Sequence, residues 1–77
     1  MRSDERTRYN RAVGIAEFII EGHTKTEAKE EFGVSRETIN KDLGLLYYTM
    51  LGNHKKNLRL YVLAQRQLEK KSQKNKL

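Results

Sequence analysis

Four polar side chains that can read nucleic-acid bases lie close together near the middle of the chain: Arg36, Glu37, Asn40 and Lys41. On a helix with about 100° between successive residues, they lie away from the apolar Ile39. Arginine can pair with guanine O6 and N7, asparagine with adenine N6 and N7, and glutamate can accept from cytosine N4. This spacing predicts a helix that enters the major groove of double-stranded DNA.

The element that must position these side chains is a short helix after a tight turn at residues 33–35. Gly33 supplies the left-handed conformation that such a turn needs. Ser35 caps the following helix, and its position also makes it a candidate base contact. Helix, turn and helix form the layout of a helix-turn-helix. We expect the second, recognition helix over residues 36–44. Gly44 weakens it, so the helix either ends there or continues less regularly towards Gly52.

The rest of the sequence predicts further helices, which gives an all-α domain of about four helices. Apolar residues recur at helical spacing over residues 4–21. Thr24 and Glu27 form a capping box at the start of a helix over residues 25–32. Residues 1–52 would then form the helix-turn-helix core. Residues 53–77 would pack on the same domain as a basic helix over about residues 53–72 and a tail, residues 73–77, that frays.

The apolar residues also predict how these helices pack. Ile39, Leu43 and Leu46 face the core, and Val34 with Ile39 joins the two helices of the motif. Ile15 and Phe18 lie on a second side of the first helix, which needs its own cover. The C-terminal helix offers a wide apolar face for this purpose: Leu58, Leu60, Tyr61, Val62, Ala64 and Leu68.

Positive charge is concentrated in the last third of the chain. The net charge is +6, yet residues 1–52 carry eight Lys/Arg against nine Asp/Glu, whereas residues 53–77 carry eight against one. Such segregation favours a polyanion as partner. We therefore predict that one basic side of the C-terminal helix contacts DNA phosphates. The residues on that side are Lys55, Lys56, Arg59, Arg66 and Lys70. Thr24, Lys25 and Thr38, within residues 1–52, are predicted to contact further phosphates.

The stretch EEFGVSRETINKDL, residues 30–43, resembles the sporulation stage III regulator D (SpoIIID-like) family of helix-turn-helix transcription factors. The resemblance is closest over FGVS, the Thr38-Ile39 pair and KDL. It implies an all-α bacterial transcriptional regulator, with residues 35–44 as recognition helix and the basic C-terminal part as a second DNA contact. Such a protein would act at the nucleoid, with RNA polymerase as an indirect partner at most.

The chain departs from the family pattern at two places. Lys29 stands where the family has a small alanine, so its side chain must extend past the neighbouring helix and open the crossing slightly. The ending EKKSQKNKL replaces a segment rich in arginine and glycine.

Several other functions are disfavoured. The chain has no cysteine, and its two histidines, His23 and His54, have no second ligand at metal-binding spacing, so we expect no metal and no cofactor. Nor is a phosphate-binding glycine loop or a pair of carboxylates across a cleft evident, so we expect no enzyme. No apolar run is long enough to cross a bilayer, and MRSDERTRYN is too polar for a signal peptide, so we expect a cytoplasmic protein.

Some alternatives stay open. The polar helix could be an ordinary solvated surface in which Glu37 and Lys41 form an ion pair. The fold could serve as a protein-interaction adaptor or anti-repressor, although apolar anchors would then be expected where the polar residues stand. RNA is a weaker candidate. A homodimer could form through Tyr47, Tyr48, Met50 and Leu51, but the basic tail favours a monomer.

Overall fold

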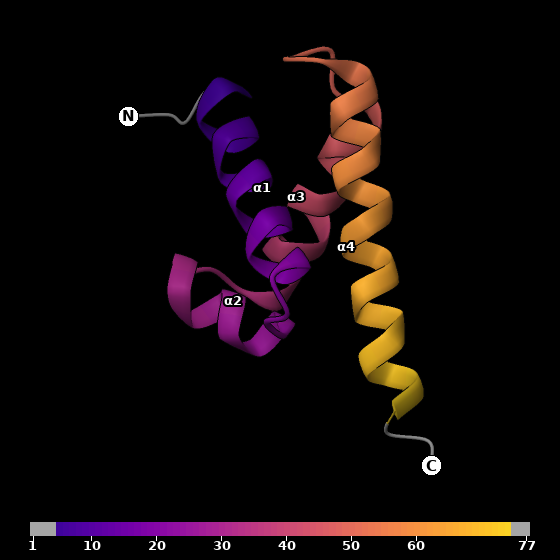
Figure 1. Ribbon diagram of the computed structural model, residues 1–77. Helices are drawn as coiled ribbons and strands as arrows, with labels where there is room; N and C mark the ends of the chain where they lie inside the picture. Colours follow the sequence, from indigo (N-terminus) through magenta and orange to yellow (C-terminus); the bar gives the residue numbers. More distant parts are fainter. Residues whose placement is uncertain (1–4, 75–77) are drawn as a thin grey trace.

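Four helices make up residues 5–74, the part of the chain that the computed structural model describes (Figure 1). They are α1 (Glu5–Ile20), α2 (Lys25–Phe32), α3 (Arg36–Tyr48) and α4 (His54–Lys74). α1, α3 and α4 pack against one another, and α2 touches only α1 and α3. The prediction of an all-α protein with about four helices is confirmed. None of the helices in residues 5–74 is long and apolar enough to cross a membrane.

Local capping chemistry begins and ends α2 where the sequence predicts. The Thr24 hydroxyl accepts a hydrogen bond from the Glu27 amide at 3.1 Å, and Glu27 Oε1 accepts from the Thr24 amide at 2.8 Å. Gly33 ends the helix with a left-handed backbone, φ 64°. These contacts satisfy backbone groups that a helix leaves unpaired at its ends. The bounds of α1 also agree with prediction to within one residue, although residue 4 lies outside the described part.

The turn between α2 and α3 has the predicted construction. The Val34 amide donates to the Lys29 carbonyl at 3.1 Å, and the Ser35 hydroxyl accepts from the Thr38 amide at 3.2 Å. Val34 is partly buried against the core, and Ile39 is fully buried. Lys29 is exposed on α2, and the expected opening of the helix crossing stays a prediction.

α3 is longer than the sequence suggests, because it continues past Gly44 to Tyr48. Leu45 and Leu46, just after the glycine, are 4% and 0% exposed. Burial of one leucine stabilises by about 1.5–3 kcal/mol, whereas a glycine within a helix costs about 1 kcal/mol relative to alanine. Packing therefore outweighs the weak local propensity: of the two predicted alternatives, the end at residue 44 is wrong, and the helix continues as far as Tyr48.

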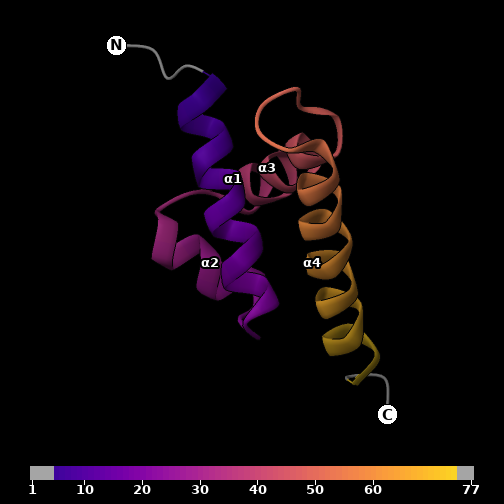
Figure 2. The same ribbon diagram turned by 45° about the horizontal axis from the view of Figure 1, so that its top comes forward.

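α4 also extends beyond its predicted bounds. Asn53 caps it, with Oδ1 accepting from the Lys56 amide at 3.1 Å, and the helix continues to Lys74. Residues 73 and 74, predicted to fray, are thus helical, while residues 75–77 lie outside the described part. The C-terminal end of α4 extends beyond α1 and α2 (Figures 1 and 2).

The core combines the apolar sides of all four helices. Its fully buried residues come mostly from α1 and α3: Ala12, Ile15, Ala16, Ile19, Ala28, Ile39, Leu43, Leu45, Leu46 and Ala64. From α4, Leu60, Tyr61 and Leu68 pack partly buried against this cluster. The apolar face of α4 is narrower than predicted, because Val62 is 44% exposed beside the basic residues.

Phe18 is covered differently from the prediction. Its ring stacks on His23, with centroids 3.8 Å apart, and meets the edge of Phe32 at 5.8 Å. These neighbours belong to α2 and the turn before it, whereas the sequence assigned the cover of Phe18 to the C-terminal helix. The ring therefore joins α1 to α2.

A polar contact that the sequence did not predict joins the first and last helices. Asn57 is fully buried; its Oδ1 accepts from the Tyr9 hydroxyl at 2.8 Å, and its Nδ2 donates to the Leu51 carbonyl at 2.7 Å. Gly52 passes so close to Tyr9 that a Cβ atom would collide with the hydroxyl. Among the described residues no buried polar side-chain atom lacks a partner. This contact fixes how α4 lies on α1.

Candidate nucleic-acid interface

The first two turns of α3 have one polar and one buried side. Arg36, Glu37, Asn40 and Lys41 are all exposed, and we call these four residues the polar face of α3. On the opposite side Ile39, Asp42 and Leu43 are buried. The helix is therefore rotated as the sequence predicts, and the four candidate base contacts share one exposed surface. In this part of the structure Glu37 and Lys41 form no ion pair with each other, so their charges are available to a partner.

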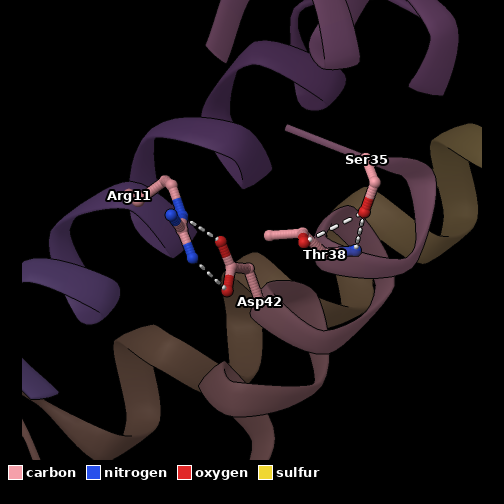
Figure 3. Close-up of polar contacts among 4 residues, drawn as sticks. All are labelled: Arg11, Ser35, Thr38 and Asp42. Carbon is pink, nitrogen blue, oxygen red and sulfur yellow. Dashed lines mark hydrogen bonds and ion pairs between the residues drawn. The ribbon is translucent and has the colours of Figure 1, made fainter. Parts of the chain in front are cut away.

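An ion pair that sequence reasoning missed fixes this rotation. Arg11 of α1 donates to both carboxylate oxygens of Asp42, from Nε at 2.5 Å and from Nη2 at 3.3 Å (Figure 3). The Asp42 side chain is 1% exposed and that of Arg11 34%. The hydrogen bond to Asp42 raises the pKa of the Arg11 guanidinium above its ordinary value. Because a bidentate pair constrains both position and angle, it ties the middle of α3 to α1.

A signal for this pair is present in the sequence. Asp42 lies three residues after Ile39 and four before Leu46, on the side of α3 that packs inward. A carboxylate in that position must find a cationic or hydrogen-bonding partner, since an unpaired buried charge is very costly. Arg11 precedes the buried Ala12 and is the partner that α1 supplies.

Two hydrogen bonds connect the polar face of α3 to the start of α2. Lys25 Nζ donates to Asn40 Oδ1 at 2.7 Å, and Arg36 Nη2 lies 3.4 Å from the Thr26 hydroxyl. Lys25 was predicted to contact phosphate and Asn40 to contact a base, and the fold brings the two together. Thr26 was not among the predicted site residues. The amino end of α2 and the polar face of α3 thus form one continuous surface.

Three predicted contact residues have structural duties of their own. Thr24 caps α2 and Ser35 caps α3, as described above. The hydroxyls of Ser35 and Thr38 lie 3.1 Å apart, so one donates to the other (Figure 3). A hydroxyl that accepts one hydrogen bond can still donate another. The assignment of these three residues to bases or phosphates stays a prediction. The fold itself requires that Thr24 and Ser35 cap their helices and that Thr38 contacts Ser35.

α4 presents a second, separate set of charges. Lys55, Lys56, Arg59, Arg66 and Lys70 are all exposed, and we call these five residues the basic face of α4. Within the described part of the chain none of them forms an ion pair with an acidic side chain, and none hydrogen-bonds to the polar face of α3. Unpaired cations along one helix suit a row of phosphates.

His23 lies in the turn before α2, as the sequence suggests. Its Nδ1 is 3.4 Å from Glu27 Oε1 and its Nε2 is 3.9 Å from Glu21 Oε1. With Phe18, Glu27, Glu30 and Glu31 it lines an open hollow. Within residues 5–74 no group of three or more histidine, aspartate or glutamate side chains is arranged to hold a metal ion.

The chain matches no protein-family model, no curated protein and no solved structure. The function must therefore be argued from the surface that the fold assembles.

Proposed function

We propose that this protein is a sequence-specific regulator of transcription that binds double-stranded DNA. α3 enters the major groove, and the basic face of α4 contacts phosphates. The observation that carries this proposal is the polar face of α3, which is exposed along two helical turns while Ile39 and the Arg11–Asp42 pair hold the reverse side. Neighbouring helices fix the orientation of α3, and a recognition helix needs a fixed orientation to align its side chains with base edges in the major groove.

Each group of residues has a role in this proposal. Arg36 pairs with guanine, Asn40 with adenine, and Glu37 accepts a hydrogen bond from cytosine. Lys41 donates to a further acceptor in the groove. Lys25 lies at the edge of the same surface, where it neutralises a phosphate. The basic face of α4 supplies attraction that does not depend on sequence, which lets a monomer bind without a second copy.

The resemblance to SpoIIID-like factors supports the same proposal and extends it. By that resemblance the protein would act in the cytoplasm of a spore-forming bacterium, bound to the nucleoid, and would change transcription by occupying DNA. RNA polymerase would respond to that occupancy without direct contact. The protein would be a binding module with neither catalytic residues nor a cofactor.

A second candidate is a protein-interaction adaptor or anti-repressor. One observation favours it: Tyr47, Tyr48 and Met50 are exposed near the end of α3. Against it, Arg36, Glu37, Asn40 and Lys41 are all polar, whereas protein interfaces concentrate binding energy in buried aromatic and aliphatic anchors. DNA binding therefore remains the better supported proposal.

The test is selection of bound sites from a pool of random duplex DNA. We expect enrichment of a short motif over successive rounds and retention that weakens as salt increases. A matched variant with Arg36→Ala and Asn40→Ala should still retain duplex DNA at low salt but enrich no motif. Failure of the parent protein to retain duplex DNA at low salt would exclude the proposal and favour the adaptor.

A further inference from the structure

Gly44 is the one glycine of this chain that the fold itself does not explain. Of the five glycines, Gly22, Gly33 and Gly52 have positive φ, which disfavours any side chain. At Gly14 a Cβ atom would lie 3.1 Å from Phe32 Cε2, so a close helix contact accounts for it. Gly44 lies within α3, and a Cβ atom there would meet nothing within 4 Å. Alanine would fit and would favour the helix.

Gly44 occupies a particular place on the surface of α3. At about 100° per residue it follows Lys41 by roughly one turn and precedes Tyr48 by roughly one turn, on the same side. Tyr47 and Tyr48 are 59% and 66% exposed. Because α3 continues to Tyr48, two exposed tyrosines follow the polar face along the helix, with the partly exposed Gly44 between that face and the tyrosines.

The tyrosines also adjoin the basic helix. The ring of Tyr47 lies 5.4 Å from that of Tyr61 of α4, centroid to centroid. Between Asp42 and Glu69 the chain contains no acidic residue, while Lys55, Lys56, Arg59 and Arg66 fall in this interval. The chain from the end of α3 into α4 therefore carries positive charge alone, which complements a polyanion.

We propose that a DNA backbone approaches α3 most closely at Gly44 and that Tyr47 and Tyr48 contact its phosphates or sugars. This inference rests on the proposed function and extends its interface by one helical turn. Glycine is the residue of choice where a backbone must approach a ligand closely. α3 is about 20 Å long at 1.5 Å per residue, whereas the major groove is about 12 Å wide. A helix that reads bases with its first two turns brings its third turn to the edge of the groove, where tyrosine hydroxyls can donate to phosphate.

The experiment compares Gly44→Ala and Gly44→Leu with the parent on the selected duplex. Since the site is open and both residues favour helix, melting temperatures should rise, for Ala by roughly 4–8 °C. Affinity should fall by about tenfold for Ala and further for Leu, because the added atoms hold the backbone away. Asn10→Ala and Asn10→Leu, at an exposed neutral position of α1, are matched controls that should bind as the parent does.

A second variant tests the tyrosine hydroxyl contacts separately from the close approach of the DNA backbone at Gly44. Tyr47→Phe with Tyr48→Phe keeps both rings and removes both hydroxyls. Affinity for all duplex sequences should fall together, by about tenfold or more for each hydroxyl removed, as expected for lost hydrogen bonds to charged groups.

Each other outcome overturns the inference in a recognisable way. Gly44 variants that are stabilised yet bind DNA like the parent would show that no backbone approaches there. Destabilised variants would mean that the fold itself needs the glycine. If the variants bind DNA normally but lose self-association in sedimentation, a second copy approaches at Gly44. If the parent binds no duplex at all, the proposed function fails first, and this inference with it.

Discussion

Asn40 illustrates how a neighbouring side chain can decide what a residue presents to a partner. Its Oδ1 already accepts a hydrogen bond from Lys25 Nζ at 2.7 Å. That bond uses one of the two lone pairs of the oxygen, so the amide still offers its Nδ2 hydrogens and one further acceptor position to a base. A bidentate contact with adenine would share this oxygen between the base and Lys25, while the remaining hydrogens of the Lys25 ammonium could donate to a phosphate. Lys25 would thus link the proposed base contact of Asn40 to a contact with the DNA backbone.

The first prediction concerns specificity. Arg36→Ala or Asn40→Ala should cost about 1–3 kcal/mol of binding free energy on the selected site and little on random duplex DNA, because each removes contacts to base edges. Fluorescence anisotropy titrations on both kinds of DNA measure the difference. Glu30→Ala, an exposed change on α2 outside the polar face, serves as the control. Equal losses on both DNAs would exclude these residues from base reading.

At the scale of the elements, the Arg11–Asp42 pair determines how α3 is presented. Arg11→Met leaves the buried carboxylate of Asp42 without its cation, and Asp42→Asn removes the negative charge that Arg11 binds. We expect each single change to destabilise the fold and the double change to cost less than their sum, with a coupling of roughly 0.5–3 kcal/mol. Urea titrations of the four proteins give the coupling. Costs that simply add would mean that the two side chains act independently.

Ile39 is the apolar contact that joins α3 to the rest of the motif. Ile39→Ala removes a fully buried side chain and should cost roughly 2–5 kcal/mol of unfolding free energy. Val62→Ala shortens a side chain that is 44% exposed and should change stability by about 0.5 kcal/mol or less. Thermal unfolding followed by circular dichroism compares the two. A similar melting temperature for both variants would contradict the assigned rotation of α3.

These elements also show what local sequence can and cannot predict. Thr24, Gly33 and Ser35 act on backbone groups within a few residues, so the bounds of α2 and the start of α3 followed from the sequence. The end of α3 depends on Leu45 and Leu46 finding partners on other helices, which local propensity does not contain. Asp42 and the polar contact between Asn57 and Tyr9 depend on residues far away in sequence, so their partners emerged only with the fold.

Across the whole molecule, the charge is distributed unevenly: residues 1–52 are nearly neutral, whereas residues 53–77 are strongly basic. Changing Lys55, Lys56, Arg59 and Arg66 to Gln should flatten the slope of log K against log salt by roughly two to four units, since each neutralised phosphate contributes about −0.9. All sequences should weaken alike, and the selected site should stay preferred. Affinity measured over a series of salt concentrations gives the slope.

The control for this variant removes charge elsewhere. Arg6→Gln with Lys29→Gln acts on exposed residues of α1 and α2 and should alter the slope by less than about one unit. Glutamine keeps helix propensity close to that of lysine and arginine, so circular dichroism should show both variants folded. An unchanged slope in the folded quadruple variant would mean that α4 does not touch DNA.

The hydrogen bond between Tyr9 and Asn57 spans 48 residues, and this separation bears on the order in which the chain folds. α1 packs against α4 and meets the buried Asn57 only once α4 has formed. The entropy of closing so long a loop must be offset before those contacts contribute. During synthesis on the ribosome, we therefore expect α1 to α3 to remain incompletely packed until α4 has emerged. If the protein binds DNA as proposed, the polar face of α3 would mature together with the basic face of α4, and a nascent chain would not compete for DNA sites.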